Sequence, residues 1–450
     1  MTIDVLNLEW VSFPARDRVM ATLVCNYLRY MGYSVIEGCV FNGYFYLNKL
    51  NPKVFFITNT IGADINFSLM KYAKSLRING VSLVSEGNFT GDNDIIDEFI
   101  WGWNKDGILY EDFNMQWTER TRDLTIKNYP ILKGKVKVSG AVGFDQYKIG
   151  GLIKKNIFLK KYSKDSFEKV IGFGCWDFGL LDPRDPRYSA WSEIYNKNDR
   201  DRFISDQMFL NNILRDIVTN NPDILFLLKE HPGCLGGRRA SAIEGLDQYQ
   251  NTLILKNEES IKDCIGICDF WIAYESTTAL EAWLLNKQTC LLNPSGTDFK
   301  RDNVYLGSPN YPNVQALQDA IDFFYSNGFL PGFSKLEGER KKIVKDTIQW
   351  DDGFNHVRAG NEIIDLINKE KPKRQPIPRY YMKEIFKQFI LWYLSPSLSF
   401  LKKFEFYAER RKAFNKKQLR AFQEKCMNEQ INFYEKNNLT KDDLRMIRCI

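Results

Sequence analysis

The stretch KVFFITN, residues 53–59, contains a run of four consecutive large apolar residues followed by a threonine. A strand with a nearly continuous apolar run is buried on both faces, which is typical of a parallel sheet covered by helices. Before KVFFITN stand the apolar run VLNLEWV, a helical pattern at residues 16–31 and the run YSVIEG. After it a helical pattern at 65–76 leads to the run VSLVSEG. Residues 1–150 therefore read as a doubly wound α/β domain.

A second series of the same kind follows. Its expected strands are KVIGFG, DILFLLKEHPG, DFWIAYES and QTCLLNP, and its expected helices cover residues 202–219, 259–264 and 277–285. The Lys-rich stretch at 147–169 has no clear period and is the expected linker. The sequence thus predicts two Rossmann-like domains, at 1–150 and 165–370, and a helical tail at 371–450.

Length and cysteine usage agree with a two-domain protein that stays in the cytoplasm. A chain of 450 residues exceeds one ordinary core. Its nine cysteines are scattered without paired CxxC spacing, so neither a disulfide framework nor a zinc site is indicated. The first residues lack the pattern of a signal peptide. The closest approach to a membrane-spanning run, FKQFILWYL at 386–394, has half of the required length. Any membrane contact is expected to be peripheral, at the inner face of the cell membrane.

The positive charge of the chain lies in its tail. Residues 371–420 carry fourteen Lys and Arg against three Glu, a formal charge of +11, whereas the whole chain carries +6. Tyr, Phe and Trp are interleaved with these cations, a pattern typical of interfacial helices on anionic lipid. No nucleic-acid-binding module accompanies the tail, so an anionic membrane surface is the expected partner and nucleic acid is not. A helix that packs its aromatic residues on the rest of the chain would give the same pattern.

His231, one of two histidines, follows the apolar run DILFLL in the stretch KEHPG. In open α/β sheets, ligands bind beyond the carboxyl ends of the strands, where this loop is expected. Pro232 restricts the backbone of His231, and Gly233 permits close approach of a ligand. A fixed imidazole can donate a hydrogen bond to a phosphate, although a surface histidine without a ligand is the simpler alternative.

A second loop, AYESTTALEAW at 273–283, places Ser276, Thr277 and Thr278 between an expected strand and helix. Hydroxyls and backbone N–H groups at such a helix start bind anions, but the same residues also cap helices that bind nothing. Glu281 lies near the first turns of that helix, within reach of a nucleotide ribose. It would otherwise only favour the helix dipole.

The two loops together resemble motifs of a known enzyme family. KEHPG and YESTTALEAWLLNKQTCLLNP resemble the HP and Ser/Thr motifs of GT-B glycosyltransferases that use CMP-activated sugars, namely bacterial sialyltransferases and β-Kdo transferases of surface-polysaccharide assembly. VSEGNF and VSGAVGFDQYK are similar to N-terminal motifs of these families. The resemblance covers roughly residues 1–330 and implies two Rossmann-like domains that face a cleft.

The resemblance implies roles for individual residues. His231, Ser276 and Thr277, with Thr278 beside them, would hold the CMP phosphate. Glu86 would act as acid or base, and a glutamate of a structural turn is the alternative at this position. Ser85 stands where the family usually has a second carboxylate. Asp145 would be the nucleophile of a retaining transferase, or structural if the reaction inverts.

Other residues are left without a role by this resemblance. Asp177, in GFGCWDFG, has no assigned role, and His356 is expected to be structural. Because His231 and the helix start can neutralise the leaving phosphate, we expect no metal and no cofactor.

The function expected from these features is transfer of Kdo, or a related 2-keto sugar acid, from a CMP-activated donor to a glycan or glycolipid acceptor of a capsule, O-antigen or lipopolysaccharide. A UDP-hexose or CDP-glycerol-type donor would suit the same fold. A nucleotide-sugar epimerase and a membrane-associated scaffold without activity are the remaining alternatives.

Overall fold

The computed structural model describes residues 3–9, 16–60, 63–85, 100–102, 104–176, 178, 197–231, 241–274, 276–295, 303–369 and 374–450. The chain forms two compact units. The first comprises Met1–Asn88, Asp92–Gly150 and Val344–Ile450, and the second Gly151–Ile343 together with Phe89–Gly91. The first unit is thus discontinuous in sequence, with the second unit inserted after Gly150. Residues 344–370, expected in the second domain, and the tail instead belong to the first unit.

The first unit contains a six-stranded parallel sheet in the order β2-β1-β3-β4-β5-β6. Every residue of β1 and β3 is buried, as the apolar run of β3 predicted for that strand. Val5 of β1 lies level with Val35 of β2 and Val54 of β3. The strands are β1 (Val5–Glu9), β2 (Val35–Cys39), β3 (Val54–Thr58), β4 (Asn79–Leu83), β5 (Phe113–Gln116) and β6 (Val136–Val138).

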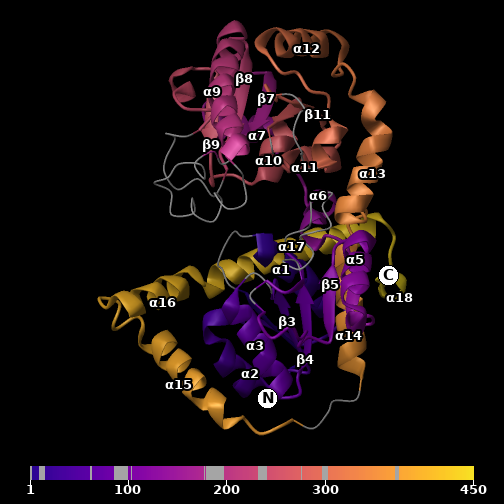
Figure 1. The fold of residues 1–450 in the computed structure, drawn as a ribbon, viewed down its shortest axis with the longest axis vertical. Helices are drawn as coiled ribbons and strands as arrows, with labels where there is room; N and C mark the ends of the chain where they lie inside the picture. The colour runs from indigo at the N-terminus through magenta and orange to yellow at the C-terminus, as the bar shows by residue number, and fades with distance from the viewer. Residues whose placement is uncertain are drawn as a thin grey trace. The chain divides into compact units, whose positions relative to one another are not determined.

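Helices cover both faces of this sheet (Figure 1). One face packs against α1, α14 and the end of α17, and the other against α2 and α3, with α15 packed on α2. The helices of this unit are α1 (Arg16–Tyr30), α2 (Gly43–Leu50), α3 (Asp64–Ser75), α5 (Glu119–Asn128), α6 (Gln146–Ile149), α14 (Asn355–Asn368), α15 (Arg379–Leu394), α16 (Lys402–Ala413), α17 (Lys416–Lys436) and α18 (Lys441–Met446).

The C-terminal helices join the first unit through buried contacts with α1. The Tyr27 hydroxyl donates to Asn361 Oδ1 of α14 at 2.6 Å. Gly360 allows this approach, since a Cβ there would lie 2.3 Å from the Tyr27 ring. Asn26 Nδ2 donates to the carbonyl oxygen of Gln423 in α17 at 2.9 Å. The last hundred residues therefore complete the core of the first sheet.

The second unit contains a five-stranded parallel sheet in the order β11-β10-β7-β8-β9. The predicted linker at 147–169 contains helix α7. The elements are α7 (Lys155–Lys161), β7 (Lys169–Gly174), α9 (Lys197–Asn220), β8 (Ile224–Lys229), β9 (Thr252–Leu255), α10 (Ile261–Ile267), β10 (Phe270–Ala273), α11 (Thr278–Leu284), β11 (Gln288–Leu291) and α12 (Val314–Asn327), followed by α13 (Glu337–Ile348), which contains the boundary between the units.

Candidate functional site

The carboxyl ends of the strands of the second sheet meet at one edge, because all its strands are parallel. Gly174 at the end of β7 lies level with Ala273 of β10 and with Lys229 of β8. Since β8 lies on one side of β7 and β10 on the other, the strand order reverses at β7. Ligands of open α/β sheets bind at such a switch point.

The structure places His231 at this edge. It lies two residues beyond the fully buried strand β8 and is itself exposed. The backbone N–H of the preceding Glu230 donates to the carbonyl oxygen of Leu255 at 2.8 Å, which holds the start of the loop against β9. Pro232 and Gly233 lie outside the described residues.

The Ser276–Thr278 segment follows β10, which lies on the other side of β7 from β8, and is at the same edge of the sheet. The hydroxyls of Ser276 and Thr278 are 2.9 Å apart, and Trp271 Nε1 donates to Thr278 Oγ1 at 2.9 Å. The Ser276 hydroxyl also accepts from the backbone N–H of Thr278 at 3.3 Å. Thr277 occupies the N-cap position of α11 and makes no side-chain capping bond there.

Gly174 brings the end of β7 close to this segment. A Cβ at Gly174 would lie 2.5 Å from Thr278 Oγ1, well inside van der Waals contact. The absence of a side chain at this position therefore allows the hydroxyl pair to approach the switch point. The sequence did not predict this close approach of Gly174 to Thr278.

Aromatic side chains follow β7 and β10 at the same edge, although their sequence pattern did not indicate a place in the site. The ring of Phe178 stacks on that of Tyr274 at 5.3 Å, and Trp176 stacks on Phe203 of α9 at 4.8 Å. The Tyr274 hydroxyl donates to the buried carboxylate of Asp206 at 2.7 Å, and the Ser295 hydroxyl donates to the same carboxylate. These contacts tie the loops after β10 and β11 to α9. Asp177, between Trp176 and Phe178, lies outside the described residues.

Glu281 lies in the first turn of α11 and is partly buried. Within the described part of the chain, no group of three or more His, Cys, Asp and Glu side chains is arranged to hold a metal ion.

In the first unit, Asp145 occupies a buried hydrogen-bonded position. It is 1% exposed. Asn355 Nδ2 lies 2.8 Å from its Oδ1, and the backbone N and ring Nδ1 of His356 lie 2.7 and 2.8 Å from its Oδ2. Both oxygens therefore serve to hold α14, which favours the structural alternative over a nucleophile.

His356 continues this network to α17. Its Nε2 lies 2.5 Å from the hydroxyl of Tyr434, and all three side chains are buried. The geometry is satisfied when Nδ1 donates to Asp145 and the Tyr434 hydroxyl donates to Nε2. The structural role expected for His356 agrees with this arrangement.

Glu9 is a carboxylate that the sequence analysis did not consider. It ends β1 beside β3, where the strand order of the first sheet reverses. Thr58 Oγ1 donates to Glu9 Oε2 at 2.7 Å, and Asn7 Nδ2 donates to Oε1 at 3.3 Å. Burial raises the pKa of Glu9 to about 8, against a smaller opposing effect of Arg18. Glu86 lies outside the described residues.

Comparison with known proteins identifies the fold. No family model matches the sequence, and no curated protein matches it. The UDP complex of S. aureus MnaA has 12% identity and a TM-score of 0.52, with 83% of this chain and 100% of that chain covered. The Neisseria meningitidis UDP-GlcNAc 2-epimerase bound to UDP-GlcNAc has 12% identity and a TM-score of 0.50, with 82% and 100% covered. A further UDP-N-acetylglucosamine 2-epimerase has 14% identity and a TM-score of 0.52, with 83% and 99% covered.

At these identities the similarity concerns the fold alone. The two parallel α/β units and the C-terminal helices of this chain form a GT-B fold, as the sequence predicted.

Proposed function

We propose that this GT-B chain is a nucleotide-sugar enzyme whose second unit binds the phosphate of the donor. The observation that carries the proposal is the placement of His231 and Ser276–Thr278 after the two strands that flank β7, at the point where the strand order reverses. An imidazole and two hydroxyls suit an anionic oxygen, because all three can donate hydrogen bonds.

The proposed reaction is glycosyl transfer from a CMP-activated 2-keto sugar acid such as Kdo. The bond between the sugar carbon and the phosphate oxygen breaks, and CMP leaves with the electron pair. An acceptor hydroxyl of a glycan or glycolipid forms the new bond and gives its proton to a carboxylate. The resemblance of KEHPG and YESTT to the motifs of CMP-sugar transferases supports CMP as the nucleotide.

For the proton transfer we propose two carboxylates of the first unit. Glu86 comes from its resemblance to the family motif. Glu9 is added because it ends β1 at the switch point of the first sheet and is held there by Thr58. Asp145 is not proposed as the nucleophile, because its two oxygens hold Asn355 and His356 inside the unit.

A second candidate function is epimerisation of a UDP-sugar. The similar structures include two UDP-GlcNAc 2-epimerases, one of them bound to UDP-GlcNAc, and the UDP complex of S. aureus MnaA. An epimerase would convert its nucleotide sugar without any acceptor. Analysis of the products formed from CMP-Kdo and from UDP-GlcNAc, each with and without a glycan acceptor, separates the two functions.

The donor site is tested by calorimetric titration of CMP, UDP and CDP into the full chain. His231→Ala should raise the Kd for CMP about tenfold or more, since a hydrogen bond to a charged group contributes about 1.5 to 3 kcal/mol. Asp223→Asn is the matched control, because Asp223 precedes the same strand at its opposite end and is exposed. Equal CMP affinity in the native chain and in His231→Ala would refute the site, and tighter binding of UDP than of CMP would favour the second function.

A further inference from the structure

Exposed large apolar side chains are concentrated in one part of the first unit. Of the 22 such residues found in the described part of the chain, ten lie between Ile377 and Phe406. No helix among the described residues is long and apolar enough to cross a membrane. A concentration of this kind on a protein surface marks a site of interaction.

Helix α15 is apolar on two adjoining faces, about 100° apart round its axis, because three of its exposed apolar residues directly follow a buried one. Tyr381, Gln388 and Trp392 face inward and are buried; Gln388 accepts from the backbone N–H of Tyr44 at 3.0 Å and donates to the carbonyl oxygen of Val40 at 3.3 Å. This face confirms that part of the tail packs on the first unit. A surface helix is normally polar on its other face.

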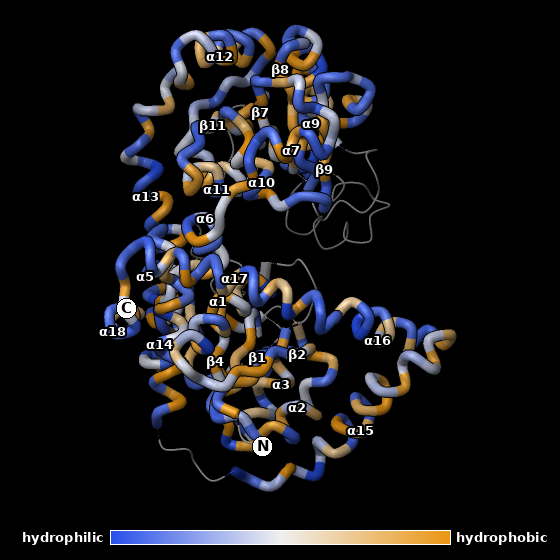
Figure 2. Tube along the Cα trace, turned by 180° about the vertical axis from the view of Figure 1, so that it is seen from behind, coloured by the Kyte–Doolittle hydropathy of each residue, from blue (hydrophilic) through white to orange (hydrophobic). Residues whose placement is uncertain are grey.

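The other face of α15 instead carries Met382, Phe386, Phe389 and Tyr393, which we call the α15 stripe. Their spacings of four, three and four residues place them on one side of the helix. Phe386 is 65% exposed and Met382 is 52% exposed. Figure 2 shows hydrophobic and hydrophilic residues interleaved along α15 and α16.

The stripe continues onto α2 and is bordered by cations. The ring of Phe45 lies 6.0 Å from that of Phe389 and 5.7 Å from that of Tyr393. Lys49 lies over the Phe45 ring at 5.3 Å, and Arg411 lies 5.7 Å from the Tyr393 ring. Aromatic rings and cations therefore occupy the same surface.

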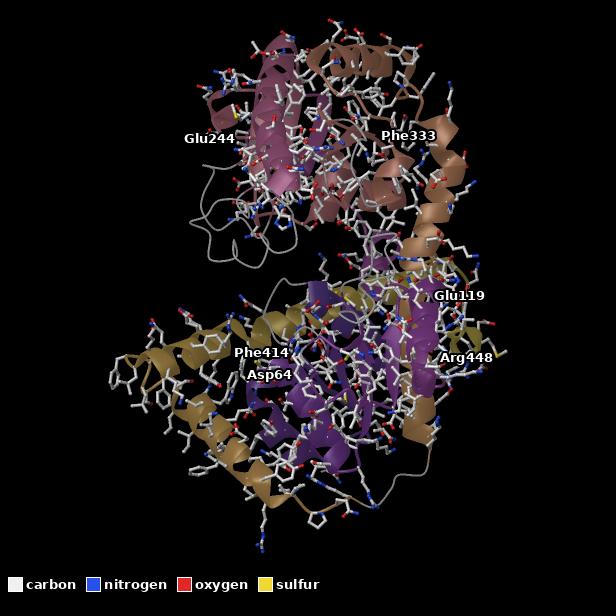
Figure 3. The ribbon with its side chains drawn as sticks, in the orientation of Figure 1. Asp64, Glu119, Glu244, Phe333, Phe414 and Arg448 are labelled. Carbon is white, nitrogen blue, oxygen red and sulfur yellow. The ribbon has the colours of Figure 1, made fainter. Side chains whose placement is uncertain are left out.

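The turn after α15 adds a second apolar element, Phe400–Lys403, which we call the tip. Its sequence is FLKK, and Phe400 is 78% exposed. Arg411 fixes the turn by donating from Nη1 to the carbonyl oxygens of Trp392 and Tyr393 at 3.1 and 3.3 Å. Arg411 lies in the last turn of α16, and Phe414, labelled in Figure 3, caps the same end of this helix. The guanidinium of Arg18 lies 5.4 Å from the Phe414 ring. The C-terminal end of α16 is thus anchored, whereas the tip at its start is exposed.

The charge of this surface indicates the kind of partner that binds it. Residues 379–413 contain eight Lys and Arg against three Glu. The cores of protein–protein interfaces are depleted of lysine, whereas this surface contains lysines beside its aromatic rings. Nucleic acid would pair with the cations but would leave the Phe and Met side chains in water. Rings at headgroup depth beside lysines are the arrangement that anionic bilayers bind. We propose that the α15 stripe and the tip dock on an anionic lipid bilayer, with Lys402 and Lys403 at the headgroup phosphates.

The test is cosedimentation of the full chain with vesicles of phosphatidylcholine, with or without phosphatidylglycerol. Point variants are preferable to deletion of residues after 370, because α17 contributes Tyr434 to the core. Phe386→Ser combined with Phe400→Ser should raise the lipid concentration for half-maximal binding at least tenfold. Lys402→Gln combined with Lys403→Gln should do the same on anionic vesicles, and high salt should weaken native binding.

The matched control is Phe323→Ser combined with Phe329→Ser, an exposed ring pair of the second unit at 5.2 Å. It should bind vesicles like the native chain, and all variants should keep the native urea midpoint. Native vesicle binding by the Phe386 and Phe400 variant would overturn the proposal. So would sedimentation velocity showing, without lipid, a dimer that this variant dissociates, because the surface would then join two copies of the chain.

Discussion

Replacement of Asp145 by Asn tests whether this carboxylate is structural or catalytic. The substitution keeps the shape but replaces one accepting oxygen by an NH2 group. If the remaining oxygen faces His356, the new NH2 faces Asn355 Nδ2, another donor. Asn355 cannot simply turn its amide over, because its Oδ1 accepts from Arg358 at 3.2 Å. One hydrogen bond to a charged group is lost and a buried donor is left unpaired, which should cost about 3 to 5 kcal/mol.

The assay is urea unfolding of the full chain, with hydrogen exchange of peptides from α1 and α14 to report on the first unit. If the free energy of unfolding falls by about 3 kcal/mol per molar urea, the urea midpoint of the first unit should fall by roughly 1 M or more. Asp351→Asn is the control: this side chain is 56% exposed and lies 3.8 Å from Lys148, so its loss should cost less than about 0.5 kcal/mol. A native midpoint in Asp145→Asn together with lost turnover would refute the structural assignment and restore the catalytic one.

Three further predictions concern the two sites. Gly174→Ala should weaken CMP binding, because the new Cβ would lie 2.5 Å from Thr278 Oγ1 and would push this hydroxyl away. Calorimetry that gives the native Kd for CMP would contradict a role for the close approach of Gly174 to Thr278. Glu86→Gln should lower turnover more than CMP affinity, which is checked by comparing initial rates with the same titration. Since burial raises the pKa of Glu9 to about 8, the folded chain keeps a proton there that the unfolded chain releases. The stabilising contribution of this proton is complete below a pH of about 4.5 and is lost as the pH rises to about 8. Over this range the urea midpoint of Glu9→Gln should therefore fall less than that of the native chain.

The sequence predicted the strands and helices well where burial produces a regular pattern. VFFIT is a strand buried at every residue, and the helix expected at 16–31 is observed as Arg16–Tyr30. Glu9 was missed because VLNLE alternates apolar and polar residues, as a strand with one solvated face does. Its polar side chains are instead buried against Thr58.

Contacts between distant segments were the main feature that could not be predicted. Asp145 and His356 are 211 residues apart, and nothing in the local pattern of either segment indicates the other. For the same reason the apolar face of α14 did not reveal which sheet it covers, so residues 344–370 were expected in the wrong unit. In the tail, the aromatic pattern allowed both packing and lipid contact. The structure separates Trp392, which is buried, from Phe386, which is exposed.

The split composition of the first unit has a consequence for biosynthesis. A nascent chain emerges from the ribosome with β1 to β6 first, yet α14 and α17, which cover one face of that sheet, are translated only after the whole second unit. The second unit, nearly continuous in sequence, can close while the first still exposes the apolar surface that Tyr27 and Leu28 share with α14 and α17. The order of folding should therefore be the reverse of the order of synthesis. A chaperone that binds exposed apolar sheet would find its longest-lived substrate in the N-terminal half.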